Sequence, residues 1–170
     1  MLRRFARDRR GVAAVEFALI LPVMLLLYYG MVETSQAVLA NRRSGYLTTA
    51  VGDLVTQQAQ VRSSDIDDIF DAGEAVLAPF STEGLSIRVT SIEIDNDGKA
   101  IERWTQDRGT IEKADLGDID EKLLEPNSAL VRAETVYVYE TPFQKVFPGA
   151  FTFKHKMDLR PRTGVLIPRN

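Results

Sequence analysis

One carboxylate lies inside an apolar stretch of this sequence, and it is the first candidate for a functional residue. Glu16 is the only charged residue between Val12 and Val32, and it comes five residues after Gly11. A carboxylate inside an apolar span costs free energy, and such residues mark functional positions in membrane proteins. The alternative is an interfacial glutamate that reaches water from one helical turn inside the membrane.

The residues before Glu16 form a basic leader. Residues 1–11 contain five arginines and one aspartate, a net charge of +4, while the whole chain has a net charge of −3. The rest of the chain is therefore acidic, which argues against nucleic acid as a partner because phosphate binding needs clustered Lys and Arg. Cysteine is absent, which excludes disulfides, thiolate metal sites and a cysteine nucleophile.

The segment 12–32 predicts a membrane span. As a helix it would be roughly 31 Å long, close to the hydrocarbon thickness of a bilayer. The arginines before it place the N-terminus in the cytoplasm and the following domain on the other side of the membrane. No small-residue cleavage site of a secretory signal follows the span, so we expect it to be retained. Pro22 predicts a kink or a loosened turn near its middle.

The boundary between the leader and the span resembles the processing site of type IV prepilins. The motif is Gly11-Val12-Ala13-Ala14-Val15-Glu16-Phe17. The longer string AAVEFALILPVMLLLYYGMVE is similar to the TadE-like pseudopilins of the tight-adherence (Tad/Flp) pilus system, and so are YVYETPF and MDLRPRTG near the C-terminus. The resemblance implies that a prepilin peptidase cuts after Gly11 and leaves Val12 with a free α-amine. Glycine suits the cut position because it has no side chain to obstruct the protease.

The resemblance also implies an assembly role for Glu16 and Phe17. In pilin-like assemblies the glutamate pairs with the terminal amine of a neighbouring subunit, which would neutralise two charges that are costly in lipid. Phe17 stands where the major Flp pilins usually have tyrosine, and those subunits are much shorter than this chain. Both differences imply an accessory or minor subunit. The implied partners are other pseudopilins, the major pilin, the prepilin peptidase and the inner-membrane assembly platform.

Two helices are expected from the spacing of apolar residues. The first continues past the span as a helix extension over 33–60, where the apolar residues at roughly helical spacing are Val38, Leu39, Leu47, Val51, Leu54 and Val55. A second helix is predicted from Asp65 to Leu77, with Ser64 as its N-cap. Its apolar face would comprise Ile66, Ile69, Phe70, Gly73, Val76 and Leu77.

A β-hairpin is expected after the second helix. Residues 85–94 and 100–106 are rich in β-branched and apolar residues, and they flank the turn sequence Asp95-Asn96-Asp97-Gly98. Asp-Gly between two such runs is a strong hairpin signal. The apolar residues change face within 85–94, which predicts a β-bulge near Ser91.

Two more strands complete the predicted sheet. Residues 107–128 read as a loop with a short helical turn at 118–124, and residues 130–140 read as a third strand. In the last strand alternate residues face the same side, which fits an antiparallel sheet with one face buried against a helix. The residues on that face are Phe151, Phe153, His155, Met157 and Leu159.

The remaining polar residues do not form a recognisable catalytic site. The acidic run Glu93–Gly98 mimics the start of a calcium loop, but the closing position is Trp104 rather than glutamate, and the flanks read as strands. The single histidine, His155, is expected to be a packed residue or one at the rim of the sheet. We therefore expect no enzyme, no catalytic residues, no metal site and no cofactor.

Together these observations predict an α+β, pilin-like chain with a long N-terminal transmembrane helix followed by a helix packed on a small antiparallel sheet. The expected parts are a leader over 1–11, a transmembrane helix over 12–32, a helix extension over 33–60 and an extracytoplasmic domain over 61–170. The expected location is the bacterial inner membrane in a single pass, with the domain in the periplasm and incorporation into the pilus left open. The implied function is assembly of a Tad/Flp-type adhesive pilus as a minor pseudopilin. The alternative is an uncleaved single-pass anchor that carries an extracytoplasmic binding domain.

Overall fold

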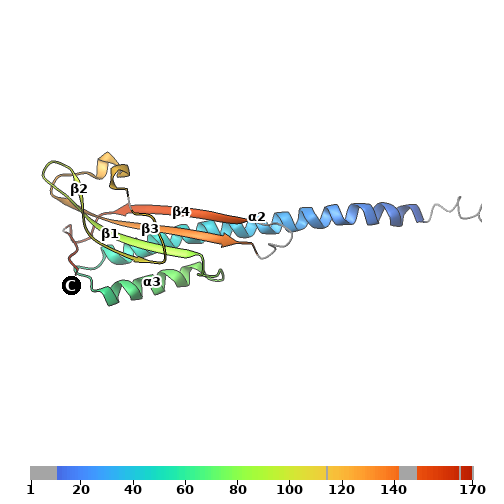
Figure 1. The fold of residues 1–170 in the computed structure, drawn as a ribbon, viewed down its shortest axis with the longest axis horizontal. Helices are drawn as coiled ribbons and strands as arrows, with labels where there is room; N and C mark the ends of the chain where they lie inside the picture. Colours follow the sequence, from blue (N-terminus) through green and yellow to red (C-terminus); the bar gives the residue numbers. More distant parts are fainter. Residues whose placement is uncertain (1–10, 114, 142–148, 165, 170) are drawn as a thin grey trace, which may run out of the picture.

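The computed structural model describes residues 11–113, 115–141, 149–164 and 166–169. Within them two α-helices, α2 (Val12–Thr56) and α3 (Ser63–Leu77), precede a four-stranded sheet of β1 (Leu85–Ile94), β2 (Ala100–Arg108), β3 (Ser128–Glu140) and β4 (Ala150–Leu159). Two short 3-10 turns, Leu116–Asp118 and Glu121–Leu123, lie between β2 and β3. The predicted α+β class is confirmed, and the chain has the shape of a rod with a domain at one end (Figure 1).

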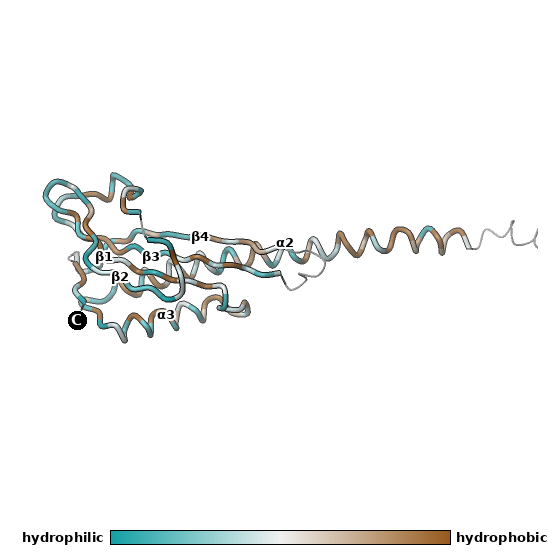
Figure 2. The backbone as a smooth tube through the Cα atoms, viewed as in Figure 1, coloured by the Kyte–Doolittle hydropathy of each residue, from teal (hydrophilic) through white to brown (hydrophobic). Residues whose placement is uncertain are grey.

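Helix α2 forms the rod and also enters the domain. It is continuous over 45 residues, about 68 Å at 1.5 Å per residue, and it runs through Pro22. Its first half projects from the domain and is predominantly apolar (Figure 2). Residues 12–29 are all exposed. This half is long and apolar enough to cross a bilayer and is the one such segment in the described residues, which suggests a single-pass membrane anchor.

The sheet is antiparallel with the strand order β2-β1-β3-β4. β1 and β2 form the predicted hairpin, in which Asp95 Oδ1 accepts hydrogen bonds from the N–H groups of Asp97 and Lys99 at 2.9 and 2.8 Å. Gly98 has φ of +77°, a conformation that glycine adopts without a steric cost. Asp95 is therefore a turn residue, and its carboxylate is occupied by the backbone of the hairpin.

The main core lies between the sheet and the second half of α2, with α3 packed alongside α2. Two glycines allow the closest approaches in this core. A Cβ on Gly73 of α3 would lie 2.6 Å from Val51 Cγ2, and a Cβ on Gly52 of α2 would lie 2.7 Å from Leu159 Cδ1. Real Cβ atoms essentially never approach other atoms so closely, so a side chain at either position would force Val51 or Leu159 to shift.

The face that α2 buries differs in part from the predicted one. Leu47, Val51 and Val55 are buried as expected, but Val38 and Leu39 are 48% and 41% exposed. The buried positions nearer the projecting half are the small residues Ala37, Ala40 and Ser44. Small side chains let α2 lie close to β3 and β4, so the most apolar residues in this part of the helix are not the buried ones.

The outer face of the sheet carries a second, smaller core. Ile92 and Ile94 pack there with Leu130 and Ile119, beneath partly buried leucines of the segment between β2 and β3. A register shift is present near Ser91, because Ser91 pairs with Trp104 and Ile92 with Glu102, but the extra residue is Arg103 of β2. β1 itself pairs regularly with β3, so the apolar residues change face along β1 without a bulge in this strand, and a covering segment buries Ile92 and Ile94 on the outer face.

Helix α3 begins at Ser63, two residues before the predicted start. Its N-cap is Arg62, whose backbone N–H donates to Asp65 Oδ2 at 2.9 Å. The prediction of Ser64 as N-cap is therefore wrong, since a carboxylate at the third helical position reaches back to the free N–H instead. The predicted apolar face is confirmed, and its buried members are Ile66, Ile69, Phe70, Gly73 and Leu77.

Strand β4 shows the predicted alternation. Phe153, His155 and Met157 are partly buried, while Lys154 and Lys156 between them are exposed. His155 Nε2 lies 3.0 Å from Asn41 Oδ1 of α2, so this face of β4 meets the helix as expected.

Candidate functional site

The predicted cleavage site lies where α2 begins. Gly11 is the N-cap of α2, with φ of −82° and ψ of −17°, and Val12 is the first helical residue. Val12 is 52% exposed, and nothing lies within 4 Å of the position that a Cβ on Gly11 would take. No described residue therefore covers the Gly11–Val12 peptide bond on the side where a side chain of residue 11 would lie.

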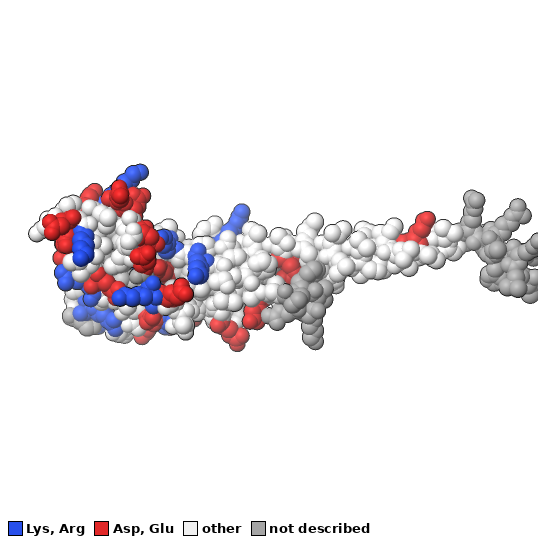
Figure 3. Space-filling model, turned by 45° about the horizontal axis from the view of Figure 1, so that its top comes forward, with Lys and Arg blue, Asp and Glu red and all other residues white. Residues whose placement is uncertain are grey.

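The predicted assembly residues lie about one turn further along the helix. Glu16 is exposed and Phe17 is 62% exposed. Val12 and Glu16 are four residues apart, so they share one face of α2. No hydrogen bond or ion pair joins Glu16 to another described residue. Charged side chains otherwise gather on the domain, and the projecting rod is almost free of them in the view of Figure 3.

A comparison with models of protein families matches residues 11–43 to the family described as TadE-like protein. The matched segment begins at the N-cap of α2, includes its projecting half and reaches the turns that enter the domain. Over these residues the chain is similar to the TadE-like family. The resemblance of the N-terminal segment is therefore confirmed. Together with the apolar helix, it fits a component of a Tad pilus.

The other comparisons and the C-terminal strings add no further assignment. Neither a search of curated proteins nor a search of solved structures found a match. The strings YVYETPF and MDLRPRTG lie outside the matched range, and residues 142–148 also lie outside the described residues.

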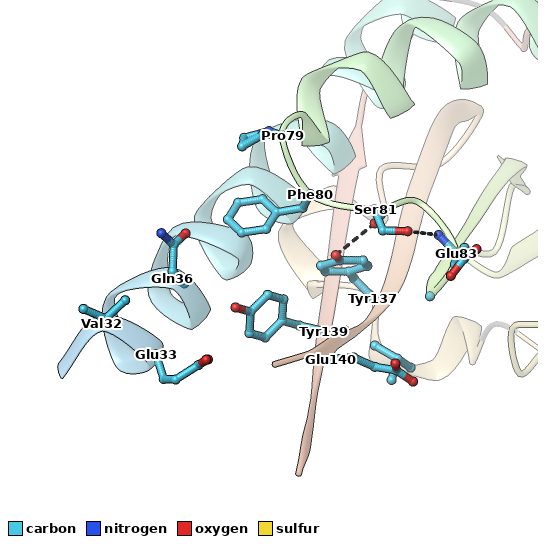
Figure 4. Close-up of a pocket in the computed structure, with 12 residues that line it drawn as sticks. Val32, Glu33, Gln36, Pro79, Phe80, Ser81, Glu83, Tyr137, Tyr139 and Glu140 are labelled. Carbon is cyan, nitrogen blue, oxygen red and sulfur yellow. Dashed lines mark hydrogen bonds between the residues drawn. The ribbon is translucent and has the colours of Figure 1, made fainter. Parts of the chain in front are cut away.

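The matched segment contains a second carboxylate, which is not among the site residues predicted from the sequence. Glu33 lies where α2 enters the domain and is 7% exposed, and neither of its carboxylate oxygens has a hydrogen-bond partner among the described residues. Tyr139 of β3 is 3% exposed, and its hydroxyl likewise has no partner among them. Figure 4 shows both side chains in the space between α2 and β3. A buried carboxylate without a partner costs free energy, which marks Glu33 as a candidate site residue.

Glu33 and Tyr139 line a cavity of about 510 Å³ between α2, β3 and the loop after α3. Three aromatic rings form part of its wall. The ring centroids of Phe80 and Tyr139 lie 5.8 Å apart in an edge-on arrangement, and those of Tyr137 and Tyr139 lie 6.5 Å apart. The Tyr137 hydroxyl donates to the carbonyl oxygen of Ser81 at 2.9 Å, which fixes this side of the cavity (Figure 4).

The electrostatics of the cavity favour a cation. Glu33, Glu83 and Glu140 belong to its described lining, which contains no Lys, Arg or His. Burial raises the pKa of the Tyr139 phenol, and the nearby charge of Glu33 raises this pKa further. Burial also raises the pKa of Tyr137, with an added contribution from Tyr139. Both phenols therefore stay neutral at physiological pH, and carboxylates alone supply formal charge to the described lining.

The helical register carries a signal that would have revealed Glu33. Buried positions of α2 follow one another at intervals of three or four residues, and counting back from Leu47 through Ser44, Ala40 and Ala37 leads to Glu33. Glu33 is the acidic residue of this buried stripe.

A different charged cluster holds the segment between β2 and β3 on the outer face of the sheet. Arg132 of β3 is fully buried, and it donates to Asp158 Oδ1 and Oδ2 at 2.6 and 2.8 Å, to Asp118 Oδ1 at 2.7 Å and to the Asp115 carbonyl oxygen at 2.6 Å. Burial lowers the pKa of Arg132, but the hydrogen bonds and charges of Asp158 and Asp118 outweigh it and leave this pKa above its ordinary value. This cluster is a structural ion-pair network, because its groups bind one another.

Proposed function

We propose that this protein is a minor pseudopilin that takes part in assembly of a Tad/Flp-type pilus. The observation that carries the proposal is the TadE-like match over residues 11–43, which falls on an exposed apolar helix with one carboxylate, Glu16, near its start. An exposed apolar rod is stable only inside a bilayer or against other apolar rods. The apolar helix of a pseudopilin lies first in the bilayer and then against the helices of other subunits. The role requires no catalytic activity of the chain itself.

Cleavage after Gly11 by a prepilin peptidase is the first step of the proposed role. The leader carries five arginines, which anchor the N-terminus at the cytoplasmic face of the membrane. Their removal leaves an α-amine on Val12 and takes away the charges that resist movement of the helix out of the bilayer. The chain is thus a substrate of the peptidase. Its domain is placed in the periplasm by the same charge asymmetry.

Pairing between subunits is the second step. Glu16 accepts the charge of the Val12 amine of a neighbouring subunit, and Phe17 packs beside this pair against the neighbouring helix. Because Val12 and Glu16 are four residues apart, a parallel neighbour would be displaced along the axis by an offset on the order of 6 Å. Other offsets leave two charges unpaired in an apolar environment, so the pair selects one register. The neighbours are other pseudopilins and the major pilin, docked at the inner-membrane assembly platform.

Substitution of Glu16 by glutamine tests this proposal. The change keeps the shape of the side chain and removes the charge, so we expect normal removal of the leader and loss of pilus assembly. Leader removal is measured by intact mass, and assembly by counting pili on cells that express only the variant. The matched control is Glu102→Gln, which removes one carboxylate from exposed strand β2. Unchanged piliation in the Glu16→Gln cells would contradict the pairing and favour a glutamate that simply reaches water.

A further inference from the structure

The cavity around Glu33 has an unexplained electrostatic cost. Both oxygens of Glu33 are buried, and no described residue donates a hydrogen bond to either. The Tyr139 hydroxyl, which could donate, has no partner either. Moving a carboxylate out of water without a compensating partner costs several kcal/mol in proteins. A cation that enters the cavity would supply the missing interaction.

The chemistry of the described lining indicates what kind of cation fits. Three carboxylates surround the space, with Glu33 buried at its inner wall and Glu83 and Glu140 exposed at its rim. The rings of Phe80, Tyr137 and Tyr139 add aromatic surface. A metal ion would require several oxygen ligands at fixed short distances. Carboxylate charge beside aromatic rings instead suits an ammonium group, which gains from both ion pairing and cation–π contact.

The position of the cavity indicates where this ammonium group comes from. Glu33 directly follows the predicted span 12–32, so the cavity lies at the level of lipid headgroups when the helix crosses a bilayer. Tyr28 and Tyr29 at the same end of the span are aromatic residues of the type enriched at membrane interfaces. Lipid headgroups surround this level of the helix on every side at high local concentration.

From these observations we propose that the Glu33 cavity binds the ammonium group of an aminophospholipid headgroup. Glu33 accepts hydrogen bonds from the ammonium group at the inner wall, and Glu83 and Glu140 attract it at the rim. The aromatic rings contact the face of the cation that the carboxylates leave free. The bound lipid holds the domain against the membrane surface at a fixed height. This proposal rests on the membrane anchor alone and requires neither cleavage after Gly11 nor pairing of Glu16.

The test uses the full chain in detergent micelles with phosphatidylethanolamine or phosphatidylglycerol, and bound lipid is counted by native mass spectrometry. We expect the wild type to retain phosphatidylethanolamine at least tenfold more strongly than phosphatidylglycerol. Glu33→Gln should abolish this preference, whereas Tyr139→Phe, which keeps the aromatic ring, should largely preserve it. Glu102→Gln, an exposed charge on β2, should leave it unchanged.

A melting curve without added lipid shows whether the variants are folded. Glu33→Gln removes an unpaired buried charge, so its melting temperature should equal or exceed that of the wild type. Retention of the lipid preference by a folded Glu33→Gln protein would overturn the proposal. Equal binding of both lipids by the wild type would overturn it too. If Glu33→Gln loses a crosslink to a lysine of another protein while its lipid binding is unchanged, the cavity binds a protein partner instead.

Discussion

Replacement of Arg132 by methionine should cost the domain a large part of its stability. Arg132 is fully buried and makes four hydrogen bonds of 2.6–2.8 Å, two of them to Asp158. The side chain of Asp158 is only 11% exposed. Methionine fills a similar volume but leaves the Asp158 carboxylate buried without its counter-charge. It also releases the segment that Arg132 holds through Asp118 and the Asp115 carbonyl group.

The size of the effect follows from this geometry. Removing one partner of a buried ion pair costs about 3–5 kcal/mol, because the other charge stays buried and unpaired. For a chain of this length each kcal/mol lowers the melting temperature by about 2–4 °C, so Arg132→Met should melt roughly 6–20 °C lower. The assay is thermal unfolding in detergent, followed by circular dichroism. Adding Asp158→Asn to the variant should recover part of the loss, and the double-mutant cycle gives the coupling between the two residues.

Arg103→Met is the matched control. Arg103 pairs with Glu93 across the β1–β2 hairpin, but their side chains are 46% and 35% exposed. An exposed ion pair of this kind contributes about 0–1 kcal/mol. A loss of less than about 1 kcal/mol in Arg132→Met, equal to that of Arg103→Met, would refute the reasoning that burial makes the Arg132 network stabilising.

Two further predictions concern stability. Hydrogen bonds from Lys156 and, less strongly, from Arg132 hold the pKa of Asp118 in the folded protein below its usual value of 3.8. The ionised Asp118 therefore stabilises the fold above pH 3.8, and this contribution is lost as the pH falls through the pKa of the folded state. Urea unfolding should show Asp118→Asn less stable than the wild type at pH 7 and equal to it well below pH 3.8. Gly73→Ala should lose about 1–3 kcal/mol against Val51, whereas Gly45→Ala should gain up to about 1 kcal/mol from helix propensity; equal stabilities of the two glycine variants would contradict the packing described.

Much of the fold is predictable from the sequence because its elements depend on local patterns. The uninterrupted apolar stretch and the helical spacing after it define α2, and the period-two alternation of Phe153, His155 and Met157 defines β4. The Asp95–Gly98 turn sets the hairpin. These signals depend on neighbouring residues, so they survive without knowledge of tertiary contacts.

The remaining features depend on contacts between distant parts of the chain. Arg132 on β3 is buried only because the segment between β2 and β3 folds back over the outer face of the sheet. Glu33 becomes a site residue only when Tyr139, more than a hundred positions later, is placed opposite it. Ala37 and Ala40 are buried while Val38 and Leu39 are exposed, because close approach of α2 to the sheet favours small side chains. The motif from Gly11 to Phe17 is recognisable from the sequence because it is contiguous.

The mass of the mature protein shows whether the leader is removed after Gly11. The chain is purified from cells with an intact pilus system and from otherwise identical cells that lack the prepilin peptidase, and its N-terminus is determined by intact mass and sequencing. We expect a protein that begins at Val12 in the first strain and at Met1 in the second. Recovery of a chain beginning at Met1 from both strains would contradict this expectation and identify the protein as an uncleaved membrane anchor.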